Sequence, residues 1–255
     1  MKKTITTTFI LSLILLGCSN AKKIPTLNAE ANCNELQDHE VFVHTANIWV
    51  DSWDALLDEI YSEGEIAVHT PDYLSKRSFD AAQVLQYLET CEDCEQVRIY
   101  FVDLHDNSNN LWMVNDLMMV NVKDCKDQIG IEFLVADSAE TSMINLDVAK
   151  DAVRRKVDNG SAANYPFIKR VYAYTYERET IKTHAENNQK LDFEFAVHDS
   201  YYSESTSTHI MNSHGLLSVD LLLKTNEQGV SKFTDFARPC PELCGLESPF
   251  YYLAN

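Results

Sequence analysis

The first seventeen residues constrain the folding of this chain most, because they decide which part of it folds and in which compartment. Lys2 and Lys3 precede an apolar stretch, residues 9–16, which ends at the small residues Gly17 and Cys18. This layout is typical of a secretory signal, and the apolar run falls far short of the ~20 residues that span a bilayer. The sequence therefore predicts export of the remaining chain and no transmembrane helix.

Residues 15–18, Leu-Leu-Gly-Cys, resemble the lipobox at which bacterial lipoproteins are cleaved. Cys18 is then the lipid-modified first residue of the mature chain, and two or more acyl chains make such attachment effectively stable. The alternative is an ordinary signal in which Cys18 lies near the cleavage site by chance. We predict a signal peptide at 1–17, a lipidated polar tether at 18–30 and an α+β domain at 31–255, either single or divided near residues 123–145.

The chain is strongly acidic, with a formal net charge of −18, and loss of Lys2 and Lys3 takes the mature chain to about −20. Nucleic acid and anionic lipid head groups are poor partners for such a chain, whereas basic proteins and cations are attracted to it. A merely well-solvated surface explains the same charge. The hydrophobic content of 45% is ample for a core, and only seven glycines argue against a glycine-rich phosphate-binding loop.

Apart from Cys18 the chain has an even number of cysteines, which favours disulfides in an exported protein. They are Cys33, Cys91, Cys94, Cys125, Cys240 and Cys244. Two pairs are close enough in sequence to bridge within a turn, so we predict Cys91–Cys94 and Cys240–Cys244, which leaves Cys33–Cys125. This is one of the 15 pairings that six cysteines allow.

Two other interpretations of these cysteines remain open. The sequence Cys91-Glu92-Asp93-Cys94 has the spacing of a thioredoxin-like redox motif, but acidic neighbours and a preceding helix would raise the thiol pKa. The pairs 91/94 and 240/244 also have the spacing of a four-cysteine zinc site. The raised thiol pKa argues against redox catalysis, and an oxidising compartment favours disulfides over the zinc site.

Apolar periodicity predicts helices at 45–62, with Ile48, Trp49 and Trp53 on the apolar face, at 78–90, capped by Ser78, and at 145–157, capped by Asn145. Runs of β-forming residues predict strands, at 97–104, 111–122, 131–135, 191–198 and 216–224. Around 172–187 alternating tyrosines give way to a helical pattern, with an open boundary. The predicted fold class is α+β, with early amphipathic helices packed on an antiparallel sheet and disulfide-bonded.

Two further segments carry a family resemblance: residues 98–102, Arg-Ile-Tyr-Phe-Val, and residues 238–244, Arg-Pro-Cys-Pro-Glu-Leu-Cys. With these the chain resembles uncharacterised lipoproteins of flavobacteria and other Bacteroidetes, which have an R-I-Y-F-like strand and a C-P-x-x-C-like element. The resemblance covers about 48–122 and 216–245 and implies no activity. Lys22 and Lys23 stand where surface-exported lipoproteins of such bacteria often have acidic residues, and Ser19 is no inner-membrane retention signal. We therefore expect attachment to the outer membrane, facing the periplasm.

One polar segment could hold a metal. His198, His209 and His214, with Asp199, offer imidazole and carboxylate ligands that suit zinc, although solvated loop histidines are the favoured explanation. Several serines lie nearby, but none stands in a nucleophile elbow; they are Ser203, Ser205, Ser207 and Ser213.

Two more groups have alternative interpretations. Asp103, His105 and Asp106 follow a predicted strand and could bind a cation such as calcium, or simply belong to a chain-reversing turn. The aromatic residues could form a partner-facing surface or pack in the core, and we favour the core. They are Tyr172, Tyr174, Tyr176, Tyr201 and Tyr202, together with Trp49 and Trp53.

Taken together, these features predict an envelope lipoprotein without a catalytic motif, anchored through Cys18, that binds another protein, with a basic protein as one expected partner. The alternative is a metal-binding protein or metal-dependent hydrolase that uses zinc on His198, His209 and His214.

Overall fold

The computed structural model describes eleven stretches of the chain, and all of them belong to the second of its two units, residues 32–255. The described residues are 39–62, 76–104, 116–137, 139–159, 168–169, 173–198, 200–203, 208–211, 217–227, 230–235 and 239–240. Among the helices in these stretches, none combines the length and the apolar character that crossing a membrane requires.

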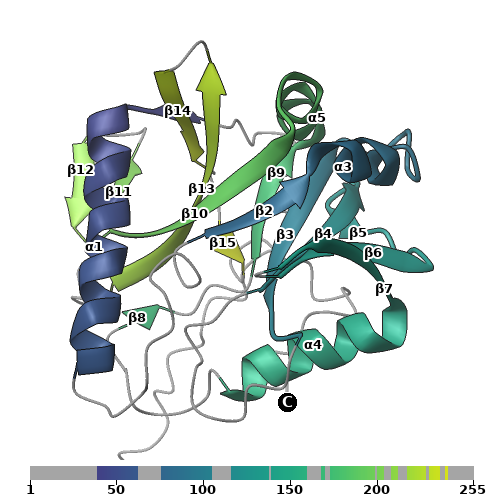
Figure 1. Cartoon of the computed structure of the whole chain (residues 1–255), viewed down its shortest axis with the longest axis horizontal. Helices are drawn as coiled ribbons and strands as arrows, with labels where there is room; N and C mark the ends of the chain where they lie inside the picture. Colours follow the sequence, from purple (N-terminus) through teal and green to yellow (C-terminus); the bar gives the residue numbers. More distant parts are fainter. Residues whose placement is uncertain are drawn as a thin grey trace, which may run out of the picture. The chain divides into compact units, whose positions relative to one another are not determined.

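Helices and two mainly antiparallel sheets form the described part, which confirms the α+β class (Figure 1). The helices are α1 (Val43–Ser62), α3 (Ala81–Leu88), α4 (Leu146–Asn159) and α5 (Arg178–Asn187). Asn145 caps α4 as predicted, because its Oδ1 accepts the backbone N–H of Val148 at 3.0 Å.

The first sheet has six strands in the order β1 (His39–Val41), β14 (Val230–Asp235), β13 (Leu217–Glu227), β10 (Lys190–His198) and β2 (Lys76–Asp80), and β8 (Ile168–Lys169) pairs with β13. All pairs are antiparallel except β8 with β13. The predicted strands at 191–198 and 216–224 are therefore its central strands, β10 and β13.

The second sheet has seven strands in the order β15 (Pro239–Cys240), β9 (Ala173–Glu177), β3 (Gln96–Val102), β4 (Asp116–Lys123), β6 (Glu132–Ala136) and β7 (Thr141–Asn145), and β5 (Lys126–Asp127) pairs with β4. The predicted strands at 97–104 and 131–135 are confirmed as β3 and β6. The prediction at 111–122 is confirmed from Asp116 onward, and its first residues lie outside the described part. Strands β11 (Ser200–Ser203) and β12 (Thr208–Met211) form a separate hairpin.

Aromatic side chains from both sheets share one core. The ring of Phe101 on β3 lies 5.9 Å from that of Phe195 on β10, and Tyr176 on β9 lies 5.6 Å from Phe193. Trp53 of α1 is fully buried, with its ring 5.7 Å from Phe195. The expected core positions of Trp53, Tyr174 and Tyr176 are thus confirmed.

Helices α4 and α1 bury further apolar clusters. Ala152 and Val153 of α4 pack with Tyr100 of β3, whereas Ala46 of α1 packs with Phe233 of β14. Figure 1 shows α4 running beside the sheet of β3, β4, β6 and β7. The apolar face of each of these two helices therefore packs against a sheet.

The predicted start of the second helix is wrong. Ser78 lies in β2, where its hydroxyl donates to Asp192 Oδ1 of β10 at 2.6 Å. The cap of α3 is instead Asp80, whose Oδ1 accepts the N–H of Gln83 at 3.0 Å. Pairing with β10, more than a hundred residues away in sequence, keeps residues 76–80 extended and outweighs the local helical pattern.

The predicted position of Ile48 on the apolar face of α1 is also wrong, since this side chain is 48% exposed. Ala46, Trp49, Val50 and Trp53 define the inward face of the helix. At 3.6 residues per turn, Ile48 lies about 100° away from Trp49 around the helix axis. It therefore points away from the sheet.

Candidate functional site

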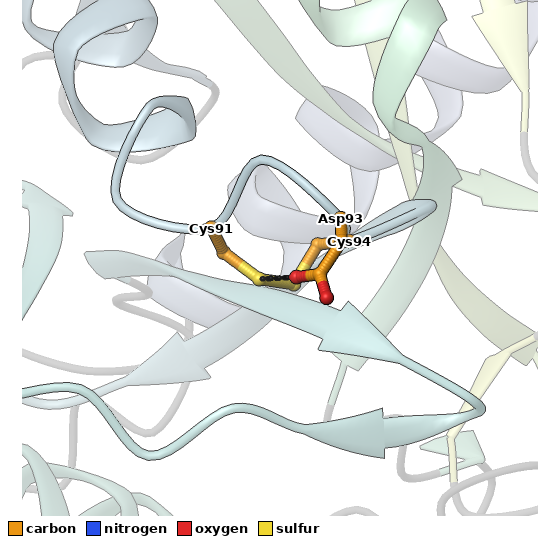
Figure 2. A group of neighbouring side chains, drawn as sticks. All are labelled: Cys91, Asp93 and Cys94. Atoms are coloured by element: carbon orange, nitrogen blue, oxygen red, sulfur yellow. Dashed lines mark hydrogen bonds between the residues drawn. A yellow bond between two sulfur atoms is a disulfide. The ribbon is translucent and has the colours of Figure 1, made fainter.

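Directly after α3, a disulfide joins Cys91 and Cys94, whose Cα atoms are 5.5 Å apart (Figure 2). The turn is closed by backbone bonds from Cys91 N–H to Leu88 O at 3.2 Å and from Cys94 N–H to Cys91 O at 3.3 Å. Because these bonds are local, the short spacing was enough to predict the bridge. This disulfide prediction is confirmed.

Asp93 completes the group of potential metal ligands found among the described residues, Cys91, Asp93 and Cys94. Its Oδ1 lies 3.5 Å from Cys91 Sγ (Figure 2). A disulfide sulfur has no proton to donate, so this contact is a close approach rather than a hydrogen bond. Since the bridged cysteines offer no thiolate, the four-cysteine zinc interpretation is wrong for this state of the protein.

An exposed ion pair ties this turn to the end of β4. The ammonium of Lys123 bonds Asp93 Oδ2, which lowers the pKa of Asp93 and raises the pKa of Lys123. The N–H of Asp124 also reaches Glu95 Oε2 at 3.4 Å. The disulfide turn and the β4–β5 turn therefore lie side by side.

The β4–β5 turn contains a second bridged cysteine. Lys123 pairs with Lys126, and the two residues between them, Asp124 and Cys125, have φ values of 49° and 65°, as a two-residue type I′ hairpin requires. Cys125 is disulfide-bonded, and its partner is neither Cys91 nor Cys94, which bond each other. Cys33, its predicted partner, lies outside the described residues, so Cys33–Cys125 stays a prediction.

The third predicted bridge is untested. Cys240 lies in β15 opposite Ala173, but its side chain and the whole of Cys244 lie outside the described part.

A charged cluster lies where β3 ends and β4 begins, with three buried members and the half-buried Lys156; we name Arg77, Asp103, Asp116 and Lys156 the β3–β4 cluster. Asp116 accepts the Arg77 Nε–H at 3.4 Å through Oδ1 and the Leu104 N–H at 3.1 Å through Oδ2. Arg77, Asp103 and Asp116 are each at most 6% exposed. Helix α4 holds the same chain segment, because the Arg155 guanidinium donates to Asp103 O at 2.8 and 3.0 Å.

Lys156 of α4 has a perturbed ammonium group. The pKa of Lys156 is lowered to about 8, chiefly by burial; the carboxylates of Asp103 and Asp116 oppose this shift, and the nearby guanidinium of Arg77 contributes to it. The carboxylate of Asp103 therefore already has the ammonium of Lys156 as a nearby positive charge. Its predicted partners in a calcium site, His105 and Asp106, lie outside the described residues, so that site stays a prediction.

The lowered pKa of Lys156 predicts a specific pH dependence. The ammonium titrates at about pH 8 in the folded chain and near 10.5 when unfolded, so the unfolded state binds more protons between these values. We therefore expect the free energy of unfolding of the wild type to rise relative to that of Lys156→Met as the pH increases from 8 to 10.5. Below pH 8 the ammonium is charged in both states, and the full cost of burying its charge destabilises the folded wild type. Urea unfolding of both proteins across this range checks it, with exposed Lys190→Met as control. A constant stability difference would contradict the expectation.

A second buried charge group lies on β3. The guanidinium of Arg98 bonds Asp127 Oδ1 through Nη1 and Thr175 Oγ1 through Nε at 3.0 Å, and the Tyr100 hydroxyl donates to Asp127 Oδ2 at 2.5 Å. Burial lowers the pKa of Arg98, but the charge of Asp127 and the contacts with Tyr100 together raise it by more, so the net shift is upward. The opposite charges of Arg98 and Asp127 neutralise each other within the core, which indicates a structural role for this ion pair.

The histidine cluster is not tested by the structure. His198 ends β10 opposite Ser218, and His209 lies in β12 opposite Tyr202, but the side chains of both are outside the described part. The remaining members of the segment, His214 and Asp199, also lie outside it. A zinc site on these residues stays a prediction, which elemental analysis of the purified chain would test.

The remaining candidates are exposed apolar side chains, which the sequence analysis did not single out as sites. Ile131 is 88% exposed and Ile129 48% exposed, on either side of Gly130 in the β5–β6 connection. At the other end of the described chain, Phe42 is 86% exposed and Val43 39% exposed. The exposure of Ile129 and Ile131 could have been predicted from the sequence, because an isoleucine stands on each side of a glycine within a polar connection.

No protein-family model, curated protein or solved structure matches this chain. The resemblance to Bacteroidetes lipoproteins, based on residues 98–102 and 238–244, therefore stays a prediction.

Proposed function

We propose that the chain is a bacterial envelope lipoprotein, anchored to the outer membrane through Cys18 and facing the periplasm, that binds a protein partner without catalysis. The lipobox at residues 15–18 supports the anchor. The disulfides at Cys91–Cys94 and at Cys125 are consistent with an oxidising compartment. In this proposal the early amphipathic helices α1 and α3 brace the sheets and take no part in chemistry.

The observation that carries partner binding is the exposed pair Ile129 and Ile131, which we name the isoleucine tip. Gly130 bends the chain tightly between them, with its N–H bonded to Gln128 O at 3.1 Å. A side chain at residue 130 would come within 3.2 Å of Glu132 O, so glycine is the residue that best fits this bend. An apolar tip on an otherwise acidic protein suits a partner with an apolar pocket and a basic rim.

Site-specific crosslinking tests this proposal. A photoreactive residue replaces Ile131 in the native envelope, and the same residue replaces Gln86, an exposed polar position on α3, as the matched control. We expect one protein adduct to dominate at position 131, to be absent at 86 and to weaken in high salt, as for a basic partner. Equal adducts at both positions would refute the isoleucine tip as the binding surface.

The anchor has a separate test. Mass analysis of the mature N-terminal peptide is expected to show acyl chains on Cys18, and an unmodified Cys18 would refute the lipoprotein assignment. Metal-dependent hydrolysis through His198, His209 and His214 is the competing function, and stoichiometric zinc in the purified chain would favour it.

A further inference from the structure

We propose that Phe42, Val43 and Ile48, which we name the α1 patch, contact the zwitterionic phospholipid bilayer to which Cys18 is attached. This inference rests on the lipid anchor proposed above and adds a second membrane contact, made by the folded domain itself. The three side chains are 86%, 39% and 48% exposed, and they lie within seven residues of chain, with Phe42 just before α1 and Val43 and Ile48 in its first two turns.

The buried face of α1 explains why Ile48 points outward. Ala46 and Trp53 are fully buried, and Trp49 and Val50 pack against the cluster that contains Leu222 and Phe233. Ile48 lies on the opposite side of the helix from these residues, whereas Val43 lies at the margin of the buried face and Phe42 precedes the helix. The α1 patch is therefore surplus to the packing of the described residues and is available for another apolar phase.

The position of the α1 patch along the chain selects the bilayer as its occupant. Phe42 is the first exposed large apolar residue in the described part, 24 residues after Cys18. Whatever the conformation of the intervening chain, 24 residues span about 85 Å at most. Among the exposed large apolar residues of the described part, those of the α1 patch are the nearest in sequence to Cys18, and tethering of this kind makes a weak contact effective.

The charges around the α1 patch define which head groups suit it. The first turn of α1 contains no acidic residue, and the exposed His44 and Asn47 lie between the apolar side chains. The nearest exposed carboxylates in sequence are those of Glu40 and Asp51, at its two margins. With a net charge of −18 on the chain, anionic lipids would repel the domain, whereas zwitterionic lipids would not.

Photocrosslinking to lipid tests the contact on the lipidated chain, reconstituted in vesicles of phosphatidylcholine. A diazirine-bearing aliphatic residue replaces Val43 in one protein and Ile131 in the other. Ile131 is an equally apolar but more exposed control, distant from α1 in sequence. We expect phospholipid adducts at position 43 to exceed those at 131 about tenfold. Phe42→Ser with Ile48→Ser should lower the yield at 43 by a similar factor, because transfer of the exposed Phe42 ring alone is favoured by about that much.

Each outcome decides a different claim. Equal lipid adducts at 43 and 131, or protein adducts alone at 43, overturn the α1 patch as a bilayer contact while leaving the anchor intact. An unmodified Cys18 in the same preparation overturns the anchor, and this inference with it. Since both substituted side chains are exposed, we expect an unchanged unfolding transition and an intact Cys91–Cys94 bridge. A shifted transition would assign Phe42 and Ile48 to the core and also refute the proposal.

Discussion

Asp127→Ala is expected to destabilise the folded chain by about 3–5 kcal/mol, because it leaves the buried Arg98 guanidinium without its counter-charge. Arg98 is only 2% exposed, so water does not replace the lost carboxylate. Tyr100 would lose its acceptor as well. Urea unfolding with the disulfides kept intact measures the loss.

Two controls show whether the loss comes from the uncompensated charge. The double variant Arg98→Met with Asp127→Leu removes both charges and is expected to recover most of the stability. Asp151→Ala breaks an exposed ion pair with Arg154, 3.0 Å long, and is expected to change stability by at most about 0.5 kcal/mol. A double variant as unstable as Asp127→Ala would show that the contacts, and not the buried charge, account for the loss.

Trp53→Ala is expected to cost about 3–5 kcal/mol, because it opens a cavity where α1 meets β10. The indole is completely buried and packs against Phe195. Loss of this contact should also loosen α1, which would be visible as faster amide exchange along the helix. Denaturant unfolding and hydrogen exchange measure the two effects.

The matched comparison for Trp53→Ala lies on the same helix. Ile48→Ser changes an apolar residue on the outward face and is expected to alter stability by no more than about 0.5 kcal/mol. Similar losses for the two variants would mean that α1 packs through a different face.

The candidate sites could be predicted from the sequence only where their parts are neighbours along the chain. The Cys91–Cys94 bridge has a separation of three residues, and its turn is closed by bonds to adjacent residues. In the β3–β4 cluster, only Asp103 was singled out. Arg77, Asp116 and Lys156 were missed, because they come from three other elements and no local pattern connects them.

The exposed patches show the same limit. Apolar periodicity on α1 is correct for Trp49 and Trp53, but it also included Ile48, which faces outward. Periodicity alone tolerates a wide apolar stripe, and the width that is really buried depends on the partner surface. Only the packed sheet distinguishes a core residue from an exposed one on the same helix.

By itself the sequence determined what depends on a few adjacent residues: the α+β class, the Asn145 cap, the short disulfide and the strands from β3 to β13 that have clear patterns. The tertiary structure alone decided that Ser78 lies in a strand and that Arg98 is buried with Asp127, 29 residues away, and Thr175, 77 away. The physical reason is that strand pairing and charge burial depend on partners distant in sequence. Their free energy exceeds local propensity, so the fold and not the local pattern assigns these residues.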